Sequence, residues 1–240
     1  MDVGLCGTEL KKIRLDPLDR KFLNALFAST NNNASSSRNK KHSEPVIRSD
    51  AELVADIRRG SDDASREIVE RYKRLLYSIA YGFLGDHSEA DDVVQQVFVR
   101  FFENVERMRK ADALKTYLAR SATNESIDRL RRAKRRKTIS LEDMGDEEAI
   151  SLEDGRTPDE HRRRAELREQ INWALSQLSE RQKRVAVLSF VDELSYEEIA
   201  RVLDCEEVTV RTHLHRARKR LQELLAPRLR DMEAGFAKEE

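Results

Sequence analysis

The chain has 240 residues, which allows one or two compact domains and excludes a large multidomain assembly. Charged residues make up 38% and hydrophobic residues 39%, so the chain is more charged and less apolar than an average globular protein. Only eight glycines and four prolines are present, too few for a many-stranded sandwich or a glycine-rich phosphate loop, so the composition favours long helices with charged outer faces.

Residues 1–48 are predicted to form a flexible extension. Within them, residues 29–43 hold almost no apolar side chains, so ordering them would cost backbone entropy with no burial to offset it. One short apolar cluster interrupts the extension, formed by Phe22, Leu23, Leu26 and Phe27. The cluster is consistent with a transient helix or a docking segment, although a plain disordered tail is the simpler interpretation.

Residues 49–137 are predicted to form a helical module. The module begins with the form of a capping box, in which Ser49 and Glu52 satisfy the first free amides of a helix. Apolar residues at helical spacing predict three further helices, over 64–84, from about 88 to 105 and over about 114–132. Gly85 follows the first of these three and suits a left-handed C-cap.

An acidic linker is predicted over residues 138–165. Nine Asp and Glu residues lie between residues 142 and 160 against a single Arg, together with two Gly and one Pro. Residues 166–228 are then predicted to form a second module of short helices. Two more capping boxes, Ser179–Gln182 and Ser195–Glu198, each precede an apolar run there. A short C-terminal tail over 229–240 completes the organisation.

Residues 195–225 carry the most informative pattern, a helix-turn-helix. A short apolar helix ends at Asp204, a residue type that tolerates the left-handed conformation moderately well, and a longer helix begins near Glu206. Apolar residues of the longer helix step by four and three, at Val210, Leu214, Ala217, Leu221 and Leu224. They leave the opposite face to Arg211, Thr212, His215, Arg216, Arg218 and Lys219. Such a face can enter a major groove and contact base edges, although a merely solvated basic surface is the alternative.

A second basic run lies over residues 129–137, with seven cations in nine residues. Because Lys plus Arg and Asp plus Glu each total 45, any indication of a polyanionic partner must come from such local clustering. The density suits phosphate neutralisation, but a solvated charge run would look the same.

Acidic residues cluster between Asp86 and Asp92, just before an aromatic-rich helix. No second His or carboxylate group recurs at ligand spacing, so a metal site is not favoured, and acids that stabilise a helix N-terminus explain most of the cluster. That explanation does not cover the polar strip Asp92, Gln95 and Gln96 with Phe98 nearby, which suits a partner surface.

Several segments resemble extracytoplasmic-function sigma factors of the sigma-70 family. The sequence DDVVQQVF from Asp91, followed by YLARSATN from Tyr117 and IDRLRR from Ile127, is similar to region 2 of that family. The sequences LSERQ from Leu178, LSYEEIA from Leu194 and VRTHLHRAR from Val210 are similar to region 4. The resemblance covers about residues 49–226 and includes the order of both modules.

The resemblance implies an all-α fold with two helical domains, regions 2 and 4, joined by the flexible acidic linker. Region 2 would bind the clamp helices of the RNA polymerase largest subunit through Asp92, Gln95, Gln96 and Phe98. It would also open the −10 promoter element. An extruded base would be held there by Asn124 and by the loop with Arg109 and Lys110. The DNA backbone would be bound by Arg129, Arg131 and Arg132. Region 4 would read the −35 element with Arg211, Thr212, His215, Arg216, Arg218 and Lys219.

The resemblance therefore implies a sigma factor that directs promoter recognition, promoter melting and transcription initiation, with no catalytic residue, metal or cofactor of its own. Its expected partners are core RNA polymerase, including the flap, promoter DNA and an anti-sigma factor of the kind that often restrains family members. The first alternative is a helix-turn-helix regulator that binds DNA without polymerase. The second is a metal-dependent nucleic-acid hydrolase built on residues 86–92.

The cellular location follows from the cysteines and the absence of long apolar segments. Cys6 and Cys205 lie far apart, which excludes a disulfide framework and suits a reducing compartment. The N-terminus lacks an apolar signal core, and no window approaches the roughly 18 apolar residues of a membrane helix. We therefore expect a cytoplasmic protein without membrane insertion.

Overall fold

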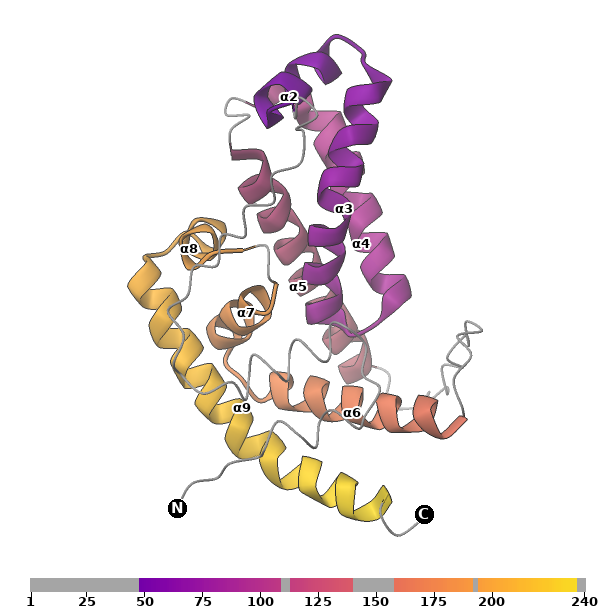
Figure 1. Cartoon of the computed structure of the whole chain (residues 1–240), viewed down its shortest axis with the longest axis vertical. Helices are drawn as coiled ribbons and strands as arrows, with labels where there is room; N and C mark the ends of the chain where they lie inside the picture. Colours follow the sequence, from indigo (N-terminus) through magenta and orange to yellow (C-terminus); the bar gives the residue numbers. More distant parts are fainter. Residues whose placement is uncertain (1–47, 109–112, 140–157, 192–193, 237–240) are drawn as a thin grey trace, which may run out of the picture.

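The computed structural model describes residues 48–108, 113–139, 158–191 and 194–236. These residues form eight α-helices and one 3-10 helix, with no strand among them (Figure 1). The expected all-α fold is therefore confirmed. The predicted N-terminal extension up to residue 47 and residues 140–157 of the predicted linker lie outside the described residues.

The first module consists of α2 (Asp50–Arg58), α3 (Asp62–Leu84), α4 (His87–Asn104), η1 (Val105–Arg107) and α5 (Leu114–Ile139). The predicted capping box is confirmed, because the Ser49 amide donates to Glu52 Oε2 at 2.7 Å and the Glu52 amide donates to Ser49 Oγ at 3.2 Å. Gly85 caps α3 in the left-handed conformation, with φ of 71°, as predicted. Helix α5 runs past the expected end near residue 132, since no Gly or Pro interrupts the Lys- and Arg-rich segment.

The core of the first module lies where α3 packs against α4 and α5. Helix α3 contributes Leu75, Leu76 and Ile79, and α4 contributes Phe101, all of them fully buried. Burial of each such side chain contributes about 1.5–3 kcal/mol to the hydrophobic stabilisation. Helix α2 is fixed to η1 by Arg58, whose Nη2 donates to the Val105 carbonyl oxygen at 2.9 Å.

The second module consists of α6 (Pro158–Ser176), α7 (Glu180–Ser189), α8 (Tyr196–Leu203) and α9 (Glu207–Phe236). Helix α6 begins inside the range expected to be linker, with Pro158 at its first position, where a missing amide costs nothing. Helix α9 continues through Pro227 into the expected C-terminal tail. Burial of Leu225 and Leu229 beside α6 offsets the roughly 3 kcal/mol that an interior proline costs.

The predicted helix-turn-helix is confirmed in α8 and α9. Ser195 and Glu198 form the capping box that begins α8. Asp204 ends α8 in the left-handed conformation with φ of 55°, so an aspartate does here what a glycine usually does. The predicted apolar side of α9 faces the core: Val210, Leu214, Ala217 and Leu221 are buried, and Leu224 is half-buried.

The two modules pack against each other, which the sequence did not predict. Helix α5 contacts α8, and α3 contacts α7, so the orange helices α7 and α8 lie beside α5 and α3 in Figure 1. The buried apolar residues form one cluster that runs through both modules. Polar contacts join them as well: Lys115 Nζ lies 2.7 Å from Glu198 Oε1, and Arg120 Nε donates to the Val202 carbonyl oxygen at 3.0 Å.

Candidate nucleic-acid and partner interfaces

One candidate interface is the polar face of α4. Asp92 and Gln95 are exposed and Gln96 is half-buried, and their i, i+3 and i+4 spacing places them side by side on the helix. Phe98 is only 7% exposed, and its ring stacks on that of Phe102 with centroids 6.4 Å apart. The structure thus groups the three polar residues and places Phe98 in the core, where it supports the face from inside.

Arg129 connects this face to α5. Its Nη1 lies 2.9 Å from Glu89 Oε2 and 3.4 Å from Asp92 Oδ2, and its side chain is 21% exposed. Partial burial lowers the pKa of Arg129, but hydrogen bonds to Glu89 and Asp92 outweigh that effect and raise it overall. A cation expected to bind the DNA backbone is therefore held by two acids of α4, of which Asp92 belongs to the polar face and Glu89 does not.

Glu125 is a buried carboxylate that the sequence reasoning missed. Its side chain is 4% exposed and contacts three guanidinium groups: Arg100 Nη1 at 2.7 Å, Arg129 Nε at 3.4 Å and Arg132 Nη2 at 3.5 Å. Because Arg100 lies on α4 and the other two on α5, the carboxylate neutralises positive charge where the two helices meet. An acid four residues before an Arg in a basic helix was the available signal, since i, i+4 pairs share a face.

The other residues expected at the −10 element lie near Glu125 along α5. Asn124 is exposed on the turn next to it. Arg131 pairs with Glu180 of α7 at 2.6 Å, so this cation faces the second module. Arg109 and Lys110, the expected loop contacts, lie outside the part of the chain that the structure describes.

The second candidate interface is the basic face of α9. Arg211, Thr212, His215, Arg216 and Lys219 are exposed there, and Arg218 is half-buried. The Arg211 side chain is positioned by two neighbours. Its Nε donates to Glu207 Oε1 at 3.0 Å, and its guanidinium lies 5.4 Å from the centroid of the Tyr196 ring. The structure therefore brings the predicted residues together opposite the buried face of α9.

Structural partners are present for three of the acids at the start of α4, namely Asp86, Glu89 and Asp92. Asp86 is the N-cap, and its Oδ1 accepts from the Glu89 amide at 2.7 Å. His87 stacks on Tyr81 with centroids 4.6 Å apart, and burial together with Arg168 lowers the pKa of the His87 imidazole. In the described ranges, no group of three or more His, Cys, Asp or Glu side chains has the arrangement of a metal site.

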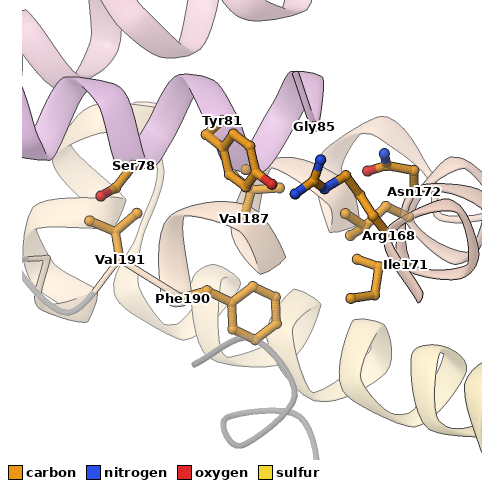
Figure 2. Close-up of a pocket in the computed structure, with 11 residues that line it drawn as sticks. Ser78, Tyr81, Gly85, Arg168, Ile171, Asn172, Val187, Phe190 and Val191 are labelled. Carbon is orange, nitrogen blue, oxygen red and sulfur yellow. The ribbon is translucent and has the colours of Figure 1, made fainter. Parts of the chain in front are cut away.

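A pocket lies between the modules (Figure 2). It is lined by Ser78, Tyr81 and Gly82 of α3, by Gly85 at the C-cap of that helix, and by Arg168, Ile171, Asn172, Leu175, Val187, Phe190 and Val191 of the second module. The guanidinium of Arg168 lies 5.5 Å from the centroid of the Tyr81 ring. A side-chain Cβ at Gly82 would lie 2.8 Å from Val187 Cγ1, so α3 and α7 approach closely only because residue 82 lacks a side chain. The pocket is therefore part of the inter-module contact.

No helix among the described residues combines the length and apolar character needed to cross a membrane.

Among solved structures, CnrH in complex with the cytosolic domain of CnrY has a similar fold, with a TM-score of 0.53 and 24% identity over 73% of this chain and 96% of that chain. The sigma factor RpoE in complex with the anti-sigma factor NepR from Bartonella quintana gives a TM-score of 0.50 and 25% identity, over 67% of this chain and 96% of that chain.

The sequence comparisons identify the family. Residues 68–136 match sigma-70 region 2, and residues 168–221 match sigma-70 region 4. The chain is 30% identical over 186 residues to the RNA polymerase sigma-H factor of Pseudomonas aeruginosa, covering 76% of this chain and 96% of that protein. It is 32% identical over 176 residues to the ECF RNA polymerase sigma factor SigW of Bacillus subtilis (strain 168), covering 72% of this chain and 94% of that protein. With both regions matched in the order of the two helical modules, the chain belongs to the extracytoplasmic-function sigma factors of the sigma-70 family.

Proposed function

We propose that this sigma factor binds core RNA polymerase through the polar face of α4 and promoter DNA through α5 and α9. The observation that carries the proposal is the placement of these surfaces: the polar strip Asp92, Gln95 and Gln96 and the basic face of α9 lie on different modules, each opposite a buried apolar face. The first module can therefore bind the enzyme through α4 while α9 of the second module binds DNA. A regulator that binds DNA alone would not need the first surface. Co-purification of the variant Asp92→Ala plus Gln95→Ala with core RNA polymerase tests the enzyme contact, and we expect that binding to be lost.

Asn124 is the proposed contact for a base extruded from the −10 element. Capture of a flipped base requires polar groups and recovers part of the unstacking cost, a few kcal/mol. Asn124→Ala should therefore reduce the permanganate reactivity of −10 thymines while leaving the closed complex intact. Asn104→Ala is the matched control, since Asn104 is exposed at the end of α4. Unchanged permanganate footprints in the Asn124 variant would remove it from the melting role.

Arg216 is the proposed base contact of region 4. It is exposed on the basic face of α9, and a bidentate bond to guanine contributes about 1–3 kcal/mol of discrimination. Arg216→Ala should lower initiation at promoters with the native −35 element by roughly tenfold and should affect templates with a scrambled −35 element much less. Equal losses on all templates would identify a phosphate contact instead.

We propose that the packed arrangement of the modules does not contact both promoter elements at once. Elements centred near −10 and −35 are about 25 base pairs apart, or about 85 Å at 3.4 Å per pair. Helix α9 has 30 residues, which corresponds to only about 45 Å. We propose that the modules separate when the protein binds polymerase and promoter.

A side chain at Gly82 should open this arrangement. Gly82→Leu adds atoms where a Cβ already lies 2.8 Å from Val187 Cγ1, while replacing glycine inside a helix favours helix formation by about 1 kcal/mol. The variant should remain helical and show a larger radius of gyration in X-ray scattering. Lys73→Leu adds the same side chain at an exposed position of α3 and should leave the radius unchanged. Equal radii for both variants would show that the contact at Gly82 does not hold the modules together.

The solved complex of RpoE with the anti-sigma factor NepR supports an anti-sigma partner for this chain as well. A partner of this kind would act where the polymerase is, and we propose the cytoplasm as the location. Fractionation of cells that express the tagged full-length protein tests this location.

A further inference from the structure

Val208 has no structural reason to be a valine. It is 69% exposed, and the other large hydrophobic residue that is exposed among the described residues, Val99, is 50% exposed. A β-branched residue at an exposed helix position lowers helix propensity relative to alanine, lysine or glutamate, and Val208 has little packing to offset that cost. Single exposed valines are common on protein surfaces, so Val208 is notable only for its place on the helix.

Val208 lies at the centre of the basic face of α9. At 3.6 residues per turn, Thr212 and Lys219 project within about 40° of Val208, whereas the buried Val210 projects about 160° away. Arg211 and Arg216 flank it on either side, at about 60° and 80°. An apolar side chain thus occupies the middle of the surface proposed to enter the DNA groove.

The position along the helix favours contact with bases rather than phosphates. Val208 is the second residue of α9, and in helix-turn-helix proteins the first residues of the recognition helix contact base edges in the major groove. Thr212 adds to the apolar character, because its Oγ1 donates to the Val208 carbonyl oxygen at 2.8 Å. That bond uses the one hydroxyl proton of Thr212, so the side chain of this exposed residue can offer a base only acceptor lone pairs and its methyl group.

We infer that Val208 is a specificity-determining residue of the −35 element and that it contacts the C5-methyl group of a thymine. The thymine methyl is the one apolar group that base pairs present in the major groove, and small apolar side chains recognise it. The inference rests on the proposed placement of α9 at the −35 element. It adds an A·T preference at one position, beside the contacts of Arg211, Thr212, His215 and Arg216.

The test replaces each −35 thymine, one at a time and on either strand, by deoxyuridine, which differs only in lacking the C5-methyl group. Full-length protein with core polymerase is assayed for promoter binding and initiation on each template. At one position the substitution should weaken wild-type binding by about fourfold, the value of one buried methyl or methylene group. Val208→Ala removes both γ-methyl groups, so it should bind the thymine template more weakly than the wild type does and should lose less with deoxyuridine.

Two results would overturn the inference. One is a wild-type protein that tolerates deoxyuridine at every −35 position; the other is a Val208→Ala variant that stays as sensitive to deoxyuridine as the wild type. Misfolding does not confuse the outcome, because alanine is the better helix former at this site. Initiation by the wild-type protein on the unmodified promoter tests the proposed function separately. Loss of the proposed function would abolish that initiation, whereas absence of the valine contact would leave it intact.

Discussion

Asp92→Ala combined with Gln95→Ala should abolish retention of the protein by core RNA polymerase in co-purification. Both side chains are exposed on one face of α4, while Val93 and Val97 anchor the opposite face in the core, so the fold does not need the polar atoms. Removal of two central interface contacts commonly costs at least about 2 kcal/mol, or about 30-fold in affinity. Initiation from all promoters should fall together with binding.

The double variant also removes one of the ion pairs of Arg129, since Asp92 Oδ2 lies 3.4 Å from Arg129 Nη1. Glu89→Ala is the control for that effect, because it removes the shorter contact to Arg129, at 2.9 Å, without touching the proposed polymerase strip. Glu103→Ala is a second control, at an exposed position near the end of the same helix. Retention of the double variant at wild-type levels would show that polymerase binds elsewhere.

Glu125→Ala should destabilise the fold by about 3 kcal/mol. Removal of one partner from a buried ion pair typically costs 3–5 kcal/mol, because the remaining charges lose their compensation. The lower end applies here, since the Arg100 and Arg132 side chains are about half exposed and can be hydrated again. The measurement is the midpoint of urea unfolding, followed by the helical circular dichroism signal. The slope of the unfolding free energy against urea concentration should be the same in the variant and the wild type.

Asp128→Ala is the matched control for Glu125. Asp128 lies on the same helix and also pairs with an Arg, Arg131 at 3.5 Å, but both side chains are about half exposed. An exposed pair of this kind contributes about 0–1 kcal/mol, so the urea midpoint should hardly move. Equal small shifts for both variants would contradict the role of Glu125 as the compensating charge between α4 and α5.

The elements that the sequence predicted well are those set by residues close together in the chain. The three serine capping boxes depend on pairs three residues apart, and the helix-turn-helix depends on the apolar spacing of α9 and on a turn residue at 204. Helix ends were less predictable where burial outweighs local preference. Pro227 indicates a stop, but α9 passes through it because Leu225 and Leu229 are buried.

The packing between modules and the charge network of the candidate site could not be predicted from local pattern. The approach of α3 to α7 depends on the missing side chain at Gly82, and no periodicity marks a glycine inside a helix as a contact point. Arg129 was expected at the DNA backbone as one of seven cations in a run. Its acidic partners Glu89 and Asp92 lie about 40 residues earlier in the chain, so only the tertiary fold shows the pairing.

The most direct test of the whole account is transcription in vitro by core RNA polymerase with and without the purified full-length protein, on a library of promoters from the native genome. The protein should concentrate initiation at a distinct subset of start sites, each with shared sequence near −10 and −35. Start sites that do not differ from those of core polymerase alone, on every template, would contradict it.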